Sequence, residues 1–404
     1  MKHVGLIKSK LEVLLVFLVI FVSGGFINLD VQVTVFVSAI ISILLLLLII
    51  MRGSIKRPAV NRAMIVITFA MLILFIKLLF ANDGFEYTPF FFRLIGNLLI
   101  AILILMYFHS NRQRLFECFY VVLVFILAQS WISLLLWLIV QSSLTPSGVE
   151  NINTFGYLVY YHSMINLNTI QLFDLTIPRN YGLFWEPGIL QLYLNILLYI
   201  VLYVRKNLKI TLLTLTAILF TWSTTGLVIL SLQLIIFSLV NIKSYIYSML
   251  SVVLLISLSG LIIKNVDEKL TGENAGSGYS RALDTFTAIN IIKKYPALGI
   301  DLNFEHFEEK LFNNTANIQM EGRYESRQAR ATNALLTYYV FFGLFFGSLI
   351  VYGLYKQKLF HEKPGIVFLI LALSLSTEPI GLFIFPILLI VSGIMYDKNY
   401  VANT

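Results

Sequence analysis

The stretch RNYGLFWEPGILQ, residues 179–191, places an arginine and a glutamate seven residues apart, where a polar loop turns into a long apolar run. A charged side chain within a membrane helix costs about 2.5 to 3.5 kcal/mol on insertion scales. Glu186 therefore either lies among lipid headgroups or has a functional role. If the helix began before Arg179, the two charged side chains would share one helical face, about two turns apart.

The rest of the chain has the composition of a polytopic integral membrane protein. Of its 404 residues, 58% are hydrophobic and 12% are charged, and the mean hydropathy is +0.86. Soluble domains carry about 25% charged residues. Cys118 is the single cysteine, which excludes a disulfide framework and a cysteine-based metal cluster. The net charge of +8 does not indicate nucleic-acid binding, because the cations are sorted by side of the membrane.

Apolar runs of about 17 to 25 residues predict membrane spans. We predict an all-α polytopic fold with about twelve spans in a single integral membrane domain, residues 1–404. The first run is followed directly by a second, so we expect it to span the membrane rather than to be a cleaved signal peptide. The predicted spans are residues 11–29, 31–51, 63–81, 91–109, 116–140, 184–204, 209–221, 226–241, 245–263, 331–355, 365–376 and 380–396.

Lysine and arginine are distributed unevenly over the alternate loops between these spans. Seventeen lie on one side, whereas the other side, leaving out its one large loop at 264–330, carries only Arg179. Loops rich in lysine and arginine face the cytoplasm. Both termini are therefore expected in the cytoplasm, and Arg179 and Glu186 are expected on the outer side.

Two predicted outer segments, residues 141–181 and 264–330, are too long to be simple turns. In the second segment Ser280 is a candidate N-cap, apolar residues follow at helical spacing, and Pro296 is a stop signal. Residues 304–311 repeat the apolar spacing. These patterns predict amphipathic helices that lie on the outer membrane surface and cover a cavity.

Several arginines and one lysine lie near the predicted outer surface. Arg323, Arg327 and Arg330 are spaced by four and three residues, on one helical face. Arginine binds phosphate through paired hydrogen bonds, so this row is a candidate pyrophosphate clamp; alternatively, it anchors a helix end among headgroups. Arg93, in FFRLIGN, is expected to face the protein interior, and Lys77 is expected to extend along its helix to the membrane surface.

Two short hinges separate pairs of brief apolar helices. TWSTTG, residues 221–226, contains hydroxyls and a glycine, and STEPIG, residues 376–381, contains Glu378 followed by a proline. Irregular backbone at membrane depth is tolerated where it is buried in protein or lines a wet cavity. We expect both hinges to border the same outward-open cavity as Glu186; the alternative is that they are surface turns.

Other motifs of catalysis are missing from the sequence. His162 and His306 are the only histidines expected on the outer side, so a histidine-rich metal site is not expected there. The sequence has neither a P-loop nor a G-x-S-x-G serine elbow. ATP hydrolysis is therefore not expected.

Four motifs, taken in order, resemble the O-antigen polymerase and O-antigen ligase superfamily. They are R-x-x-G-x-F-x-E-P at residues 179–187, S-T-T-G at 223–226, S-R-A at 280–282 and Y-P-A-L-G-I at 295–300. The resemblance covers residues 179–347 in motifs and the whole chain in topology. It implies a bacterial inner-membrane glycosyltransferase of the GT-C type, which works on the outer face without a metal, a nucleotide sugar or another cofactor.

The resemblance also implies the substrates. The donor is a glycan on undecaprenyl pyrophosphate, and the partners would be the lipid bilayer, a chain-length regulator and a flippase. In a polymerase the acceptor is a fresh lipid-linked repeat unit; in a ligase it is lipid A core. Ligases tend to carry a histidine before an asparagine near the end of the large loop, where this chain has Thr332 and Asn333. This departure weakens the ligase assignment.

The resemblance assigns phosphate binding to Arg179 and Arg281, and this chemistry is compatible with the residues. Cations stabilise the charge that builds up on a leaving pyrophosphate. The attacking hydroxyl needs a base, for which Glu186 is the first candidate and His306 and Asp301 are reserves. Aromatic residues could stack on sugar rings or form part of the interfacial belt; these are Tyr181, Trp185 and Trp222.

A polymerase is therefore the leading hypothesis, and a ligase is the second. A third, from another class, is a secondary transporter that uses Glu186 and Glu378 as proton carriers. The long outer segment at 264–330 and the lack of a visible inverted repeat argue against a transporter.

Overall fold

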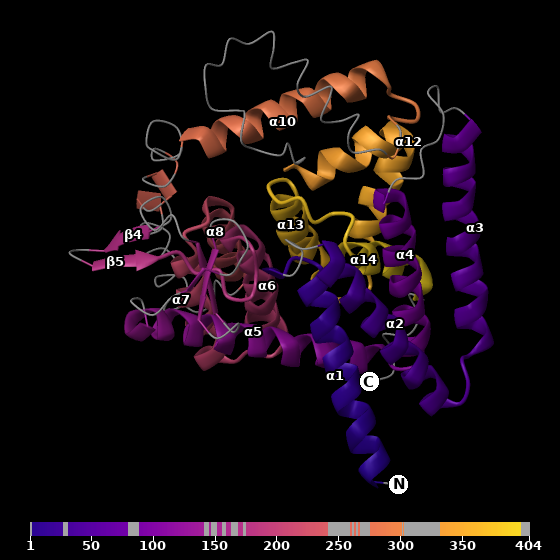
Figure 1. The fold of residues 1–404 in the computed structure, drawn as a ribbon, viewed down its shortest axis with the longest axis horizontal. Coiled ribbons are helices and arrows are strands. Elements are labelled where there is room, and N and C mark those ends of the chain that lie inside the picture. Colours follow the sequence, from indigo (N-terminus) through magenta and orange to yellow (C-terminus); the bar gives the residue numbers. More distant parts are fainter. Residues whose placement is uncertain are drawn as a thin grey trace.

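The fold is known from a computed structural model, which describes residues 2–26, 31–79, 89–140, 145–146, 152–155, 159–162, 169–172, 175–240, 259–260, 262–263, 266, 275–300, 302 and 332–396. Within these residues the chain is predominantly helical (Figure 1). The long helices are α1 (Lys2–Val22), α2 (Val31–Arg52), α3 (Arg57–Leu79), α4 (Pro89–Phe108), α5 (Arg112–Val140), α6 (Pro187–Tyr199), which continues as a π-helical turn (Ile200–Val204), α7 (Leu208–Thr221), α8 (Thr224–Val240), α10 (Ala275–Lys294), α12 (Ala334–Tyr355), α13 (Pro364–Leu375) and α14 (Ile384–Met395).

Several of these helices are long and apolar enough to cross a membrane. By length and composition the described residues contain six such helices: Gln32–Arg52, Arg57–Lys77, Phe91–Phe108, Arg112–Trp137, Pro187–Val204 and Ala334–Tyr355. Four shorter apolar helices are Leu208–Thr221, Thr224–Val240, Pro364–Leu375 and Ile384–Met395. The structure therefore confirms the character of a multi-pass α-helical membrane protein. The predicted count of twelve stays a prediction, and the predicted span 245–263 lies largely outside the described residues.

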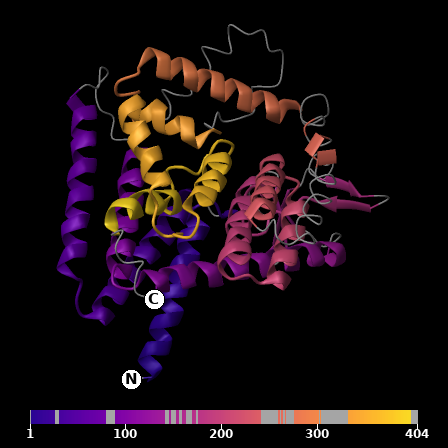
Figure 2. The same ribbon diagram turned by 180° about the vertical axis from the view of Figure 1, so that it is seen from behind.

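Helix α6 is the centre of the bundle. Every residue from Pro187 to Tyr199 is buried, and the helix packs against α5, α7, α8 and α13 (Figures 1 and 2). A helix that is apolar on all sides is buried by its neighbours rather than exposed on one face. The stretch that begins this helix therefore leads into the centre of the bundle.

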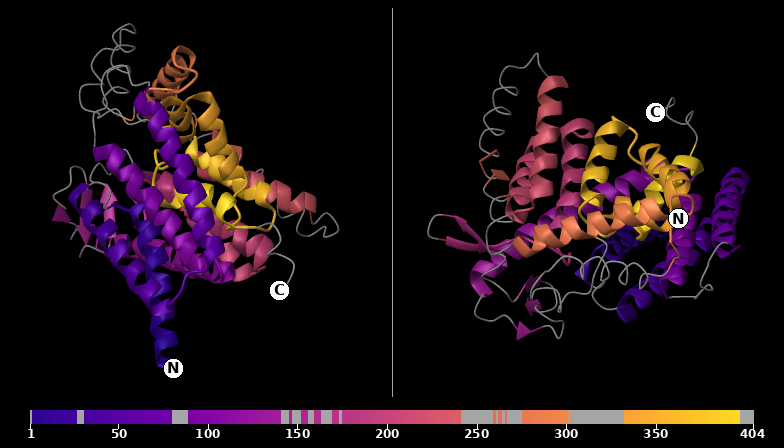
Figure 3. Two further views of the ribbon diagram at one scale, coloured as in Figure 1. Left: turned by 90° about the vertical axis from the view of Figure 1, so that its right-hand side faces the viewer. Right: turned by 90° about the horizontal axis from the view of Figure 1, so that it is seen from above.

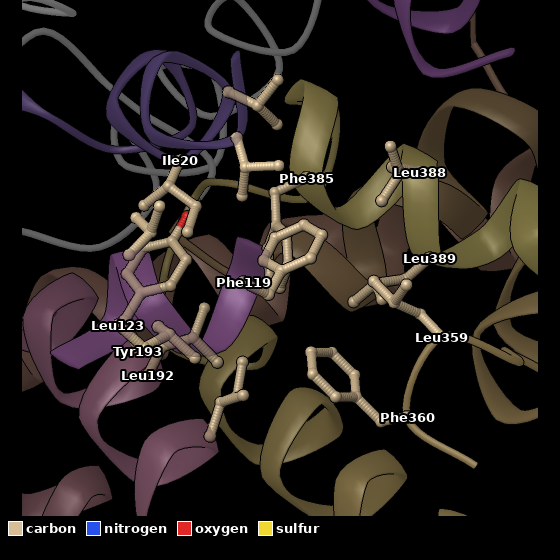
Figure 4. Close-up of a cluster of buried hydrophobic side chains, with 14 of the residues drawn as sticks. Ile20, Phe119, Leu123, Leu192, Tyr193, Leu359, Phe360, Phe385, Leu388 and Leu389 are labelled. Atoms are coloured by element: carbon tan, nitrogen blue, oxygen red, sulfur yellow. The ribbon is translucent and has the colours of Figure 1, made fainter. Parts of the chain in front are cut away.

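Aromatic side chains pack α6 against α14. The ring centroids of Tyr193 and Phe385 are 5.4 Å apart, and those of Phe119 and Phe385 are 5.6 Å apart. Phe360 lies against Phe119 at 6.1 Å. Figure 4 shows these rings and the surrounding leucines of the same buried cluster. This packing brings the C-terminal helices to the N-terminal half of α6.

The first long loop, 141–181, adds short strands to the otherwise helical fold. It contains short strands in two antiparallel sheets: β1 (Thr145–Pro146), β2 (Ile152–Phe155) and β3 (Val159–His162) in order β1-β2-β3, and β4 (Thr169–Leu172) paired with β5 (Leu175–Pro178). In β4 and β5, Thr169 is opposite Pro178 and Leu172 is opposite Leu175. The chain thus returns from β5 directly into Arg179.

The second long loop contains the expected helix after Ser280, but α10 begins earlier, at Ala275, so Ser280 lies inside the helix and is not its N-cap. Figures 1 and 3 show α10 lying across the end of the bundle that is farthest from the N-terminus. It packs against α12. The second amphipathic helix, predicted at 304–311, lies outside the described residues.

Candidate functional site

The loop 179–186 enters the bundle as irregular backbone, and buried hydrogen bonds hold it there. Asn180 donates from its backbone N–H to Phe220 (2.8 Å) and from its side chain to the carbonyl of Ser130 (3.1 Å). Its side-chain oxygen accepts from the N–H of Gly182 (3.0 Å). Gly182 has φ +54°, a value that glycine adopts at little cost. The loop is therefore fixed to α5 and α7.

The other side of this loop is held by the end of α1. The N–H of Phe26 donates to Leu183 (3.1 Å), and Gly25 and Phe184 form an antiparallel bridge. The ring of Phe184 stacks on Tyr193 in α6, with centroids 4.9 Å apart. The loop is thus enclosed by elements from three distant parts of the sequence.

Glu186 is the residue immediately before α6. Its backbone is extended (φ −139°, ψ 144°), and Pro187 takes the first helical position, which suits proline because the N–H there has no partner within the helix. Arg179 and Glu186 are therefore not on one helical face, because the helix does not begin before Arg179. A folded loop, rather than a helix, brings the two side chains to the same region.

The hinge at 376–381 places Glu378 against the start of α6. A Cβ atom at Gly188 would overlap with Oε1 of Glu378, so only glycine leaves room for this carboxyl. Glu378 is 1% exposed, and its Oε2 is buried without a hydrogen-bond partner among the described residues. The guanidinium of Arg281, on α10, lies 3.8 Å from Oε1. A carboxyl group, a helix start and a cation thus meet at Gly188.

Burial and a second carboxyl group determine the protonation of Glu378, which lies in the hinge outside α13 and α14. Burial raises its pKa well above the ordinary value, and the Glu186 carboxyl raises it further through charge and a side-chain hydrogen bond. Arg281 and Arg179 lower the pKa, but by less than burial and Glu186 together raise it. Two carboxyl groups in one enclosed site cannot both ionise cheaply. We therefore expect Glu378 to retain a proton at pH values where an exposed glutamate is ionised.

Arg179 and Tyr181 complete this group of side chains. The Nε of Arg179 donates to the carbonyl of Thr221 (3.1 Å), at the hinge after α7. Burial raises the pKa of Tyr181 to about 12, with Arg179 lowering and Glu186 raising it. Arg179 acts electrostatically on Glu378 as well. The structure therefore brings together five residues selected from the sequence: Arg179, Tyr181, Glu186, Arg281 and Glu378.

The two hinges meet at this site. The hydroxyl of Thr225 donates to that of Thr377 (3.2 Å), which joins the hinge 221–226 to the hinge 376–381. Asn97 on α4 donates to Leu382 (3.0 Å), and Tyr338 on α12 donates to Gly381 (2.6 Å). The hinges therefore contact each other and neighbouring helices, which argues against the alternative that they are surface turns.

Arg93 lies at the edge of the site and not in the interior. Its side chain is exposed, and its guanidinium lies over the ring of Phe383 at 4.4 Å. The ring of Phe383 is 5.9 Å from that of Trp185, beside Glu186. Arg93 is therefore linked to the site through two aromatic rings. The expectation that it faces the protein interior is wrong, because Arg93 is exposed.

Several other predicted residues lie outside the described residues. They are Asp301, His306, Arg323, Arg327 and Arg330. Thr332 and Asn333, at the position where ligases carry histidine, have structural contacts: the Thr332 hydroxyl donates to Asp284 (2.8 Å), and the Asn333 side chain caps α12 by accepting from Leu336 (3.0 Å). Among the described residues, no three histidine, cysteine, aspartate or glutamate side chains are grouped so that they could hold a metal.

Sequence reasoning missed two features near the site. The first is Lys77, which is buried and hydrogen-bonded to three carbonyls instead of extending to the surface. The available signal was that Lys77 lies near the predicted outer end of its helix, on the side that is otherwise poor in lysine and arginine. The second is a buried row of amides below the carboxyl pair: Gln191 bonds to Ser374 (3.3 Å), Asn195 to Gln191 (2.9 Å) and Gln233 to Asn195 (2.9 Å). The spacing of 191 and 195 on one apolar helix was its signal.

Comparisons with family models, with characterised proteins and with solved structures each find no match to this chain.

Proposed function

We propose that the protein is a surface-polysaccharide polymerase of the O-antigen type, which transfers a glycan from undecaprenyl pyrophosphate to the non-reducing end of a lipid-linked repeat unit. The observation that carries this proposal is the meeting of Arg179, Arg281, Glu186 and Glu378 at the start of the most buried helix. Charged groups in a membrane protein mark functional sites by default, because they are costly to bury.

Each residue has a role in the proposed reaction. The acceptor hydroxyl attacks the anomeric carbon, and the bond from that carbon to the pyrophosphate oxygen breaks with inversion. Arg179 and Arg281 stabilise the negative charge that leaves with the pyrophosphate. Glu186, half-buried beside the fully buried Glu378, takes the proton from the attacking hydroxyl. Glu378 holds Arg281 in place until the anionic substrate arrives.

The finer architecture belongs to the same proposal. We assign the chain twelve spans of GT-C type in the bacterial inner membrane, with both termini in the cytoplasm and the site at the outer face. The positive-inside distribution of lysine and arginine supports this orientation. No metal or nucleotide cofactor is assigned. A flippase would supply the repeat units, and a chain-length regulator would act on the product.

The direct test uses purified protein in lipid nanodiscs with a lipid-linked repeat unit. We expect ladders of longer glycans. Arg281→Ala and Arg179→Ala should abolish them, and Glu186→Gln should slow the reaction by about 10² to 10⁴-fold. Lys293→Ala is a matched control, because Lys293 is an exposed cation on the same helix as Arg281. Full activity in both arginine variants would contradict the assignment of pyrophosphate binding to Arg179 and Arg281.

A gene deletion in the host separates the polymerase from the ligase, which shares the chemistry but transfers the glycan to lipid A core. Loss of a polymerase leaves single repeat units on the core. Loss of a ligase leaves an uncapped core and polymer on the lipid carrier. The contact of Thr332 with Asp284 favours the polymerase, since no histidine base occupies that position.

The buried amide row favours one function of another class, proton-coupled transport. Gln191 and Asn195 on α6 and Gln233 on α8 continue from the carboxyl pair and are fully buried. Such polar rows occur along proton paths in transporters. Acidification of proteoliposomes on substrate addition, lost in Glu186→Gln, would support this function. Ladder formation without any proton flux would exclude it.

A further inference from the structure

Helix α12 is interrupted in its middle. Gly343 has φ 69° and ψ 179°, so the helix stops and restarts at this residue. The interruption frees backbone N–H and C=O groups from their partners within the helix. Such groups need other partners at membrane depth, because an unpaired one costs several kcal/mol in the absence of water.

The segment 295–300, which follows α10, fills this break. Leu344 donates to the carbonyl of Pro296 (2.8 Å), and Ile300 donates to the carbonyl of Val340 (2.8 Å). The approach is close enough to require glycine on both sides. A Cβ at Gly299 would overlap with Val340, and a Cβ at Gly343 would overlap with Ala297.

The ammonium group of Lys77, on α3, lies at the same break. It donates to the carbonyls of Leu298 (2.7 Å) and Ile300 (2.7 Å) and also to that of Phe341. An ammonium has three donors, so these three acceptors satisfy it. Lys77 is 7% exposed. Two of its carbonyl partners, Ile300 and Phe341, belong to a buried apolar cluster that also contains Ile73, Leu74, Phe91, Val340, Phe342 and Phe346.

These contacts connect Lys77 to the candidate site through one helix. The segment 295–300 is the direct continuation of α10, and α10 carries Arg281. One turn after Arg281, Asp284 accepts from Thr332 at the start of α12. Helix α10 is therefore attached to α12 at two points, and the second attachment includes the cation from α3.

We propose that Lys77 is a positioning residue, whose ammonium acts as a tethered cation that locks the end of α10 into the break of α12 and so holds Arg281 against Glu378. A surface-seeking lysine would place its ammonium in water. Here the ammonium fills a cage of backbone carbonyls, the type of site in which broken helices of transporters hold a metal cation. The consequence for catalysis rests on the proposed function, but the lock itself is testable without substrate.

The test measures the distance between spin labels by double electron–electron resonance in the full-length protein. Labels are placed at two exposed positions outside the site, Phe286→Cys on α10 and Leu72→Cys on α3. The native Cys118 is buried, which protects it from labelling. We expect one narrow distance distribution with Lys77, and a broadened one in both Lys77→Ala and Lys77→Met. Lys293→Met, an exposed lysine of α10, should leave it narrow.

Adding free alkylammonium ions to the variants distinguishes the effect of the Lys77 charge from the effect of the volume of its side chain. Ethylammonium or propylammonium should narrow the distribution in Lys77→Ala, because the free cation can occupy the carbonyl cage, whereas it should not change Lys77→Met, where the cage is filled by an apolar chain. A narrow distribution in Lys77→Met, or no rescue of Lys77→Ala, would overturn the proposal.

Hydrogen exchange on the unmodified protein covers the case in which the variants do not fold. The N–H groups of Ile300 and Leu344 should exchange at least about 100-fold more slowly than those of an unstructured peptide, since the lock keeps them bonded. Unprotected exchange at both amides would refute the lock. With a working polymerase assay, Lys77→Met should lower kcat more than it raises KM, and Lys77→Arg should recover part of kcat. Failure of the proposed function would remove this activity but leave the distances and the exchange unchanged.

Discussion

Gly188→Ala tests the packing of Glu378 against α6. The added methyl group would overlap with Oε1 of Glu378, and overpacking of a filled interior costs about 1 to 3 kcal/mol. In an ordinary helix the same change is favourable by up to about 1 kcal/mol, because alanine has the higher helix propensity. A single measurement would mix the two effects.

The chain offers a matched control that removes the propensity effect. Helix α13 begins with Pro364 and Gly365, just as α6 begins with Pro187 and Gly188. A Cβ at Gly365 would have no neighbour within 4 Å. The propensity gain is therefore the same in both variants, and the difference between Gly188→Ala and Gly365→Ala isolates the overlap, about 1 to 3 kcal/mol against Gly188→Ala.

Thermal unfolding in nanodiscs, followed by tryptophan fluorescence, measures the stability difference, and glycan ladders measure activity. We expect Gly365→Ala to be fully active and Gly188→Ala to lose most of its activity, because displacement of Glu378 also displaces Arg281. Equal stability and equal activity of the two variants would refute the placement of Glu378 at the start of α6.

Three further changes test the surroundings of the site. In Glu378→Gln the stability should become less dependent on pH. Because the pKa of Glu378 is raised in the folded protein, its contribution to the free energy of unfolding is complete below the ordinary pKa of 4.5 and is lost as the pH rises through the raised pKa. The melting temperature of the wild type should therefore fall over that pH range, whereas that of the variant should not. Asn180→Ala removes the side-chain bonds to Ser130 and Gly182 and should cost about 1 to 3 kcal/mol in thermal unfolding; an unchanged melting temperature would contradict the role of Asn180 in fixing the loop. Thr332→Val removes a hydrogen bond to the Asp284 carboxylate and should cost about 1.5 to 3 kcal/mol, whereas Thr332→Ser should retain most of this stability.

The helices could be predicted from the sequence because most of them are continuous apolar runs. Helix α2 was predicted at 31–51 and is Val31–Arg52, and α12 was predicted at 331–355 and is Ala334–Tyr355. The short strands of the loop 141–181 were missed, since segments of two to four residues have too few positions to show an alternating pattern. The break in α12 was also missed, because Gly343 lies within an uninterrupted apolar run.

The site could be predicted in part because charged residues are conspicuous in apolar sequence. Arg179, Glu186, Arg281 and Glu378 were selected for this reason, and the structure brings them together. Their exact partners were not predictable. That Gly188 faces Glu378 depends on how α13 and α14 fold back, a long-range contact for which one sequence carries no local signal. Lys77 was assigned to the membrane surface because its carbonyl partners become available only through the break in α12.

The contact between Gly188 and Glu378 also has a consequence for biogenesis. Residue 378 is synthesised 190 residues after residue 188, when most of the membrane helices have already emerged from the ribosome. Until then Glu378 does not yet cover the first turn of α6, and Arg281 lacks the carboxyl group that it contacts. The site is thus assembled only after α13 and α14 have been translated, and a nascent chain that ends before them would have Arg179 and Arg281 without the carboxyl group of Glu378.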